Sequence, residues 1–176
     1  MTAPVLIYLA GPHVFEVDAR GTRSALEQTC ERHNLVGIWP ADVDAPAGET
    51  HPQRAQRIFQ ANIDRLRSAR GVLADLRPFR GAEPDSGTVF EVGMAFALGI
   101  PVVAYGVPPG DYASRVATAL PVEVDVAGVL RDRAGLAVED FGLPLNLMLA
   151  CAVAVVTTAD EAAAELARIL LPASPA

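Results

Sequence analysis

Short apolar segments alternate with helix-like segments along this sequence, and that alternation constrains its fold more than any other feature. Four apolar segments have the length and the flanking turn residues of buried strands, over residues 5–10, 35–39, 71–76 and 100–105. Helical periodicity follows the first three of them, over residues 22–33, 53–69 and 87–98. Apolar strands that alternate with helices form parallel sheets covered on both sides. The sequence therefore predicts a doubly wound α/β fold.

The C-terminal part of the chain carries weaker signals. Residues 106–139 are rich in Pro, Gly and Asp, and we expect them to run over the surface without regular structure. Two closing helices are predicted over residues 143–153 and 160–171, with a short fifth strand around residues 155–156. A chain of 176 residues is long enough for one sizeable core. We expect a single domain over residues 1–176, with a sheet of about five strands.

The loops that follow the strands are the expected place for function. Doubly wound folds bind ligands at the carboxyl ends of their strands, where the strand order reverses. The first strand ends at Gly11-Pro12, and loops over residues 41–51 and 77–86 follow the second and the third. We therefore expect functional residues after strands one, three and four.

The charged residues exclude several classes of protein. All 14 basic residues are Arg, so no lysine is present for a Schiff base, for pyridoxal phosphate or for a Walker-type phosphate site. With 21 acidic residues the net charge is −7, and nucleic-acid binding requires a positive surface. No apolar run reaches the roughly 20 residues that span a bilayer. We expect a small-molecule ligand, with no nucleic acid and no membrane as partner.

Cysteine and histidine give no sign of a disulfide or of a metal site. Cys30 and Cys151 are far apart in helix-like sequence, and we expect two buried, reduced thiols. His13, His33 and His51 are scattered, without the spacing of metal ligands, although His13 follows the first strand and could line a pocket. The N-terminus enters the first strand without a basic region or a cleavage signal, so we expect a cytoplasmic protein.

Glu91 is the most informative residue, because it lies within the apolar helix predicted over residues 87–98. A carboxylate on a helix without a polar face loses its hydration, which is unfavourable unless the group is paired or used. No basic residue lies between Arg80 and Arg115. A buried glutamate is paired for structural reasons about as often as it is catalytic. Both interpretations stay open on this residue alone.

Two further carboxylates are predicted to approach Glu91 at the carboxyl edge of the sheet. Asp85 lies shortly before it, and Asp75 stands near the end of the third strand. Grouped carboxylates suit chemistry at an anomeric carbon, where an ionised one attacks the sugar and a protonated one assists the leaving group. Glu91 would then be the nucleophile. The alternative roles are a helix N-cap for Asp85 and acceptance of backbone N–H bonds for Asp75.

Four segments carry a combined pattern that is more specific than any single residue. They are Tyr8-Leu9-Ala10-Gly11-Pro12, residues 74–81, residues 85–93 continued by Ala95, Ala97, Gly99 and Pro101, and residues 143–149. In this order and in these strand and helix contexts, they resemble the nucleoside 2-deoxyribosyltransferase family. The resemblance covers most of the chain, and residues 85–101 are its most specific part.

The resemblance implies a flavodoxin-like fold and cofactor-free transfer of a 2-deoxyribosyl group between nucleobases. Its substrates would be deoxynucleosides and free nucleobases. By position in the pattern, Glu91 is similar to the nucleophile that forms a covalent deoxyribosyl intermediate, and Tyr8 to the residue that orients its carboxylate. Asp85 is similar to a residue that contacts the sugar hydroxyls. Two displacements at the anomeric carbon retain its configuration.

The resemblance also implies a set of substrate-binding positions. These are Gly11, Pro12, Asn62, Gly87, Asn146 and Met148. Asn146 and Met148 resemble positions that reach into the active site of a neighbouring subunit, Asn146 toward the 5′-hydroxyl, so a homo-oligomer would be required for activity. Without the resemblance, Tyr8 is interpreted as an ordinary strand aromatic and Asn146 as a capping amide.

One position departs from the family pattern. Several members carry an Asp on the second helix that protonates the departing base, and this chain has Asn62 there. Asp64 lies two residues further on and does not share a helix face with Asn62. Asp75 and Asp85 remain as candidates for the general acid.

Two other functions stay open. A hydrolase that releases the base from deoxynucleoside 5′-monophosphates needs serines and basic groups near the phosphate, and the loop after the first strand has Glu16 instead. A non-catalytic nucleoside-binding module on the same scaffold has no use for a buried nucleophile. Arg77 and Arg80 flank Phe79 in the third loop, a pattern that suits an anion, a stacked base or a surface pair with acidic neighbours.

Overall fold

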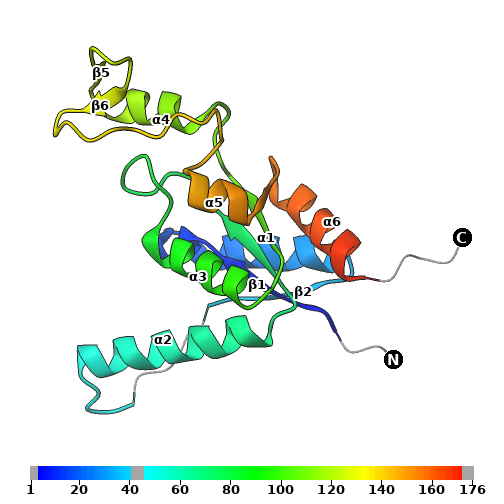
Figure 1. The fold of residues 1–176 in the computed structure, drawn as a ribbon. Helices are drawn as coiled ribbons and strands as arrows, with labels where there is room; N and C mark the ends of the chain where they lie inside the picture. Colours follow the sequence, from blue (N-terminus) through cyan, green and yellow to red (C-terminus); the bar gives the residue numbers. More distant parts are fainter. Residues whose placement is uncertain (1–3, 41–45, 172–176) are drawn as a thin grey trace, which may run out of the picture.

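Five parallel strands form the centre of the computed structural model, which describes residues 4–40 and 46–171 (Figure 1). The strands are β1 Leu6–Ala10, β2 Val36–Ile38, β3 Gly71–Asp75, β4 Val102–Tyr105 and β7 Ala154–Val155. Their order across the sheet is β2-β1-β3-β4-β7, and every pair is parallel. This is the strand order of flavodoxin-like folds. The predicted α/β fold with a single domain and about five strands is therefore confirmed.

Helices cover both faces of the sheet. The helices of the two outer layers are α1 Ala19–Arg32, α2 His51–Ser68, α3 Ser86–Ala97, α5 Leu147–Ala152 and α6 Ala159–Leu170. α1 and α6 pack on one face, and α2, α3 and α5 pack on the other. Successive side chains of a strand point to opposite faces. Ile7 and Leu9 accordingly join the core under α1 and α6, and Tyr8 and Ala10 join the core under α2 and α3.

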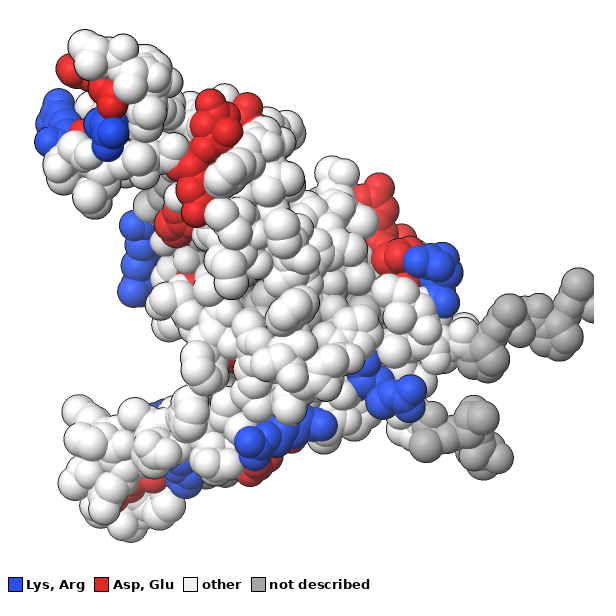
Figure 2. All heavy atoms as spheres, in the orientation of Figure 1, with Lys and Arg blue, Asp and Glu red and all other residues white. Residues whose placement is uncertain are grey.

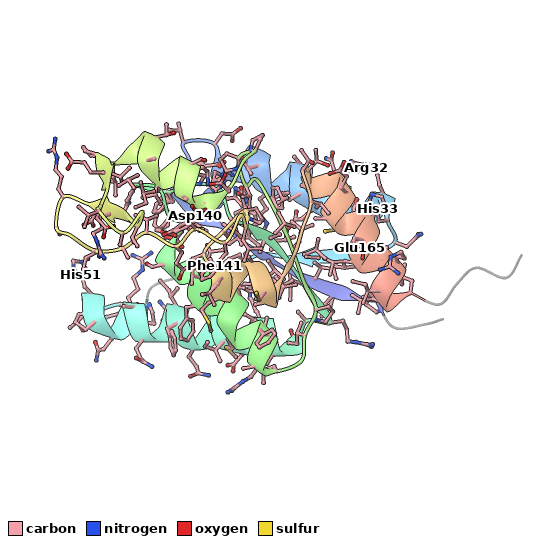
Figure 3. All side chains as sticks on the ribbon, turned by 45° about the horizontal axis from the view of Figure 1, so that its top comes forward. Arg32, His33, His51, Asp140, Phe141 and Glu165 are labelled. Atoms are coloured by element: carbon pink, nitrogen blue, oxygen red, sulfur yellow. The ribbon has the colours of Figure 1, made fainter. Side chains whose placement is uncertain are left out.

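The end of α1 lies against α6, where Figure 3 labels Arg32 and His33. Asp160 accepts a hydrogen bond of 2.8 Å from Arg32 and lies 3.2 Å from Nε2 of His33. Arg32 and Asp160 are each more than half exposed, and such surface pairs contribute about 0–1 kcal/mol. The two helices are therefore held mainly by buried apolar side chains, among them Cys30 and Leu166.

The strand order reverses between β1 and β3, and this reversal positions the site. From β1 the chain crosses to β2 on one side, and from β2 it returns to β3 on the other side. The loops after β1 and β3 therefore separate at their carboxyl ends and leave a crevice. The loop after β1 forms a short 3-10 helix, η1 Pro12–Phe15, which the sequence pattern did not predict.

The prediction that residues 106–139 lack regular structure is wrong. They form α4 Tyr112–Ala119 and an antiparallel hairpin of β5 Val122–Val124 and β6 Leu130–Asp132, which stand away from the sheet at the top of Figure 1. Asp111 caps α4 by accepting a bond of 2.7 Å from the Ser114 N–H. Asp125 accepts the N–H groups of Ala127 and Val129, which shapes the hairpin turn.

Two helices begin at other residues than the pattern predicts. α1 begins at Ala19, before the periodicity predicted from residue 22, because Asp18 caps it; the Thr22 hydroxyl donates to Glu16. α5 begins only at Leu147, after the N-cap Asn146. In both cases a capping side chain sets the start, independently of the apolar periodicity that follows.

The expectation of two buried thiols is half wrong. Cys30 is fully buried, and its thiol pKa is raised to about 11 by burial. Cys151 is exposed, because it lies on the outer side of the short helix α5. No helix within the described residues is long and apolar enough to cross a bilayer. Residues 41–45, part of the loop predicted over residues 41–51, lie outside the described ranges.

Candidate active site

A cavity of about 410 Å³ opens at the reversal of strand order, between η1, α2 and the first turns of α3. It is lined by Gly11, Val14, Phe15, Pro40, Ile58, Asn62, Asp85, Gly87, Thr88 and Glu91. Its volume suits a small organic molecule. One wall is mainly apolar, from η1 and α2, and the other carries the two carboxylates from α3. A ligand with a flat apolar part and a hydroxylated part fits such a division.

Glu91 lies in this cavity, and no cation of residues 4–40 and 46–171 pairs with it. Tyr8, fully buried on β1, donates its hydroxyl to Oε1 of Glu91 at 2.5 Å. Burial raises the pKa of the Glu91 carboxyl to about 7; the Tyr8 hydrogen bond opposes this shift, and the charge of Asp85 adds to it. Within the described ranges no Arg or His forms an ion pair with Glu91. The Tyr8 hydroxyl thus holds the Glu91 carboxyl in place, and no described cation balances the charge of its ionised form.

Asp85 serves as the N-cap of α3 and also lines the cavity. Its Oδ2 accepts the backbone N–H of Thr88 at 2.9 Å and the Thr88 hydroxyl at 3.1 Å. The interpretation of Asp85 as a helix N-cap is therefore correct. The same residue also lines the cavity, so the two positions are compatible. Capping fixes the Asp85 carboxyl at the start of α3, where it lines the same cavity as Glu91 and its charge acts on Glu91.

Asp75 is not brought together with the other two carboxylates. It is 2% exposed and paired with Arg77, whose Nε lies 2.6 Å and whose Nη2 lies 2.5 Å from Oδ2. The backbone N–H of Arg77 also donates to Oδ1 of Asp75. This is the alternative role given above for Asp75, the acceptance of backbone N–H bonds. Gly106 follows β4 with φ +76°, and a Cβ at that position would collide with Oδ1 of Asp75. Asp75 does not line the Glu91 cavity.

His13 belongs to the Asp75 cluster and not to the cavity. It is buried, with Nε2 3.0 Å from the Tyr105 hydroxyl and 3.4 Å from Oδ2 of Asp75. Its Nδ1 lies 2.7 Å from Nη2 of Arg77, and its ring stacks on Trp39 at 5.7 Å. The cluster joins the loops that follow β1, β3 and β4 into one polar unit beneath the cavity floor at Gly11.

The substrate-binding positions implied by the sequence divide into two groups. Gly11, Asn62 and Gly87 line the cavity, and Pro12 is buried beside it at the start of η1. A Cβ at Gly11 would come within 3.0 Å of the His13 ring and of Asp75, so the floor is closely packed there. The apolar wall was missed by the sequence prediction: Val14, Phe15, Pro40 and Ile58. Only the run Val14-Phe15 after Gly-Pro signalled part of it.

Asn146 and Met148 line a different groove, of about 510 Å³, between α3 and α5. Asn146 caps α5 by accepting the Leu149 N–H at 3.2 Å. Met148 is 75% exposed, and Phe90 and Phe96 on the outer side of α3 are 53% and 61% exposed. Figure 2 shows hardly any charged side chain over this part of the surface. α3 is therefore apolar on nearly all sides, as the sequence predicted. Its outer side, with Phe90 and Phe96, is not covered by the described residues.

The described residues contain no group of three or more His, Cys, Asp or Glu side chains arranged to hold a metal ion. The chemistry supported by the cavity is that of its carboxyls. A cation-free, hydrogen-bonded glutamate beside a second carboxylate can attack an electrophilic carbon and then leave it.

Comparison with known proteins agrees with this geometry. The family model described as nucleoside 2-deoxyribosyltransferase matches residues 7–148. The structure of a 2-deoxyribosyltransferase from Leishmania mexicana superposes with a TM-score of 0.76 at 31% identity, covering 96% of this chain and 100% of that one. A conserved protein from Enterococcus faecalis shares the fold, with a TM-score of 0.61 at 20% identity, 96% of this chain and 100% of that one.

A sequence relative adds length information. An uncharacterized protein of Schizosaccharomyces pombe is 30% identical over 113 residues, which are 62% of this chain and 54% of that protein. The chain thus matches about half the length of this relative.

Proposed function

The chain belongs to the nucleoside 2-deoxyribosyltransferase family, and we propose that it moves the 2-deoxyribosyl group of a deoxynucleoside from one nucleobase to another. The observation that carries the proposal is Glu91, a partly buried carboxyl that no cation of the described residues pairs with and that the Tyr8 hydroxyl holds at the cavity surface. The relevant relatives act on deoxyribosyl groups, and a nucleophile in a cavity of this size serves that reaction.

The reaction has two displacements. The ionised Glu91 attacks C1′ of the deoxynucleoside, a C1′–O bond forms, and the C1′–N bond breaks with its electron pair passing to the base, which takes up a proton. A ring nitrogen of the second base then attacks C1′, and Glu91 leaves as a carboxylate while the incoming base loses its proton. Each step inverts C1′, so the product retains the configuration.

Tyr8 and Asp85 have supporting roles in this proposal. The Tyr8 hydrogen bond occupies one carboxylate oxygen and leaves the other to attack. Asp85 contacts the sugar hydroxyls. Of the two candidates for the general acid, Asp75 is paired with Arg77 outside the cavity, which leaves Asp85 as the carboxyl that, in its protonated form, can donate to the leaving base.

The groove between α3 and α5 supports an oligomer with shared sites. We propose that a second copy covers the exposed Phe96 and Met148 of this groove and thereby brings Asn146 to the partner's cavity, toward the 5′-hydroxyl. Burying large apolar side chains stabilises such an interface by about 25 cal/mol per Å². Sedimentation that finds only monomers at assay concentrations would overturn this arrangement.

The test of transfer is a base-exchange assay. The protein is incubated with deoxyinosine and free adenine, with thymidine as a parallel donor, and the products are separated by chromatography. Formation of deoxyadenosine supports the proposal. A matched incubation without adenine detects hydrolysis. Free base from deoxynucleoside 5′-monophosphates alone would replace transfer with the hydrolase, and binding without turnover would leave the nucleoside-binding module.

A further inference from the structure

Three side chains form a stacked cluster at the rim of the cavity. The rings of Phe15, on η1, and Phe79, in the loop between β3 and α3, stack with centroids 5.3 Å apart. The guanidinium carbon of Arg80 lies 4.6 Å from the Phe79 centroid and 5.4 Å from that of Phe15. Phe15 is 59% exposed and also lines the cavity, so one ring joins the cluster to the candidate active site.

The guanidinium of Arg80 keeps its hydrogen-bond donors available. Three residues earlier in the same loop region, the Arg77 side chain directs its donors to Asp75, Glu16 and His13. Arg80 has neither a hydrogen bond nor an ion pair with any residue in the described ranges; its contacts are the two rings. The five N–H donors of an arginine lie in a rigid plane and suit a planar acceptor edge.

The backbone of this loop holds Arg80 in an uncommon conformation. Its φ is +56°, in the left-handed region that residues other than Gly rarely adopt. The Phe79 N–H donates to the Glu83 carbonyl at 2.8 Å, which closes the loop around Arg80, and Glu83 in turn accepts the Tyr112 hydroxyl of α4. Such conformations persist where surrounding contacts enforce them, often at ligand sites.

The division of the cavity determines which part of a nucleoside meets Arg80. C1′ must lie at Glu91, and the sugar hydroxyls face Asp85 and Gly87 on α3. The flat base then lies along the apolar wall, where Phe15 stands. The rim where the guanidinium lies therefore faces the lateral edge of a purine base, which carries the C6 substituent and N7.

We propose that Arg80 is a specificity-determining residue that favours 6-oxopurines as bases, an inference that rests on the proposed transferase function. Guanine and hypoxanthine present two adjacent acceptors, O6 and N7, which match two donors of an arginine. Adenine presents N7 beside an N6 donor, which opposes the guanidinium, and thymine offers only O4 at this edge. The Phe15–Phe79 stack restricts the side-chain rotation of Arg80, so the selection is made by a preorganised group.

The test compares donors and variants. kcat/KM for deoxyinosine and deoxyadenosine is measured with one common acceptor base, for the wild type and for Arg80→Ala, Arg80→Lys and the control Arg133→Ala. Arg133 is an exposed arginine directly after β6 that does not line the cavity. We expect Arg80→Ala to lose about tenfold to a hundredfold with deoxyinosine and little with deoxyadenosine. Arg80→Lys keeps the charge without the planar fork and loses most of the same preference.

Binding of the free bases separates this inference from the transferase function. The affinities of hypoxanthine and adenine are measured by calorimetry on the same four proteins. A hypoxanthine affinity that falls selectively in Arg80→Ala supports the inference even if no donor gives transfer, an outcome that removes only the proposed function. Equal losses with all bases, or a wild type that transfers without preferring deoxyinosine, would overturn the role of Arg80 and leave transfer intact. Absence of both transfer and base binding would overturn both.

Discussion

Asp75 and Glu91 are both acidic side chains at the carboxyl edge of one sheet, and they differ in their partners: Asp75 has a cationic one and Glu91 a neutral one. Asp75 is almost fully buried and is neutralised by Arg77 in a cluster that also holds His13 and Glu16. Glu91 is largely buried and receives only the neutral hydroxyl of Tyr8. The difference teaches that burial alone does not identify a reactive carboxyl. A carboxyl becomes a candidate nucleophile when burial is combined with the lack of a cation.

The largest effect should come from Glu91→Gln, which removes the attacking oxygen and keeps the shape of the side chain. We expect base exchange to fall by at least about 10⁴-fold, the scale found when a nucleophile is removed. The amide oxygen still accepts the Tyr8 hydroxyl, so the protein should remain folded by circular dichroism. Glu31→Gln, an exposed glutamate of α1, is the matched control and should exchange normally. Unimpaired base exchange by Glu91→Gln would show that Glu91 is not the nucleophile, and its carboxyl would then differ from that of Asp75 only in its partners.

Asp75→Asn should show the reverse pattern, a loss of stability with transfer retained. The amide leaves the Arg77 guanidinium less well paired in a buried cluster, and we expect the free energy of unfolding in urea to fall by about 1–3 kcal/mol. Asp64→Asn, on the exposed side of α2, is the control and should change stability by less than about 0.5 kcal/mol. If Asp75→Asn abolished transfer at unchanged stability, Asp75 would return as the general acid.

The smallest effect concerns pH. The wild-type kcat/KM should rise with pH through about 7, because the Glu91 carboxyl must ionise before it attacks. The Tyr8 hydrogen bond favours the ionised form, so Tyr8→Phe should raise the pKa of Glu91 and move the profile by about one pH unit in the alkaline direction. Tyr112→Phe, which removes a hydroxyl remote from Glu91, should leave the midpoint in place. An unchanged midpoint in Tyr8→Phe would assign Tyr8 a packing role only.

The sequence predicted the sheet, the helices around it and the place of Glu91, because these depend on local periodicity and on strand ends. It also paired Tyr8 with Glu91 through the family pattern, and the contact is present in the structure. The cluster around Asp75 and Arg77 was not predictable, because the approach of His13 and Tyr105 depends on how distant segments of the chain fold together.

Other differences have equally specific causes. The β5–β6 hairpin is shaped by the Asp125 side chain, a signal that is easily lost in a segment rich in Pro and Gly. The exposure of Cys151 depends on which other elements pack against α5. The apolar periodicity of the sequence predicts a helix there but not the elements that cover it. Phe15 reaches the cavity because η1 turns the chain directly after β1. A 3-10 helix of four residues is too short to produce a recognisable apolar periodicity in the sequence.

If the protein transfers the deoxyribosyl group in the two half-steps proposed above, the apolar wall of the cavity has a kinetic consequence. After the first base departs, its place beside the sugar ester is empty, and water competes with the second base for C1′. Val14, Pro40 and Ile58 offer that water no side-chain hydrogen bonds and no base to deprotonate it. The wall therefore favours dewetting between the two half-steps, and the ratio of exchange to hydrolysis becomes a property of its hydrophobicity. In the proposed reaction, the aliphatic residues of the wall would thus set how long the glycosyl ester of Glu91 lasts before water cleaves it.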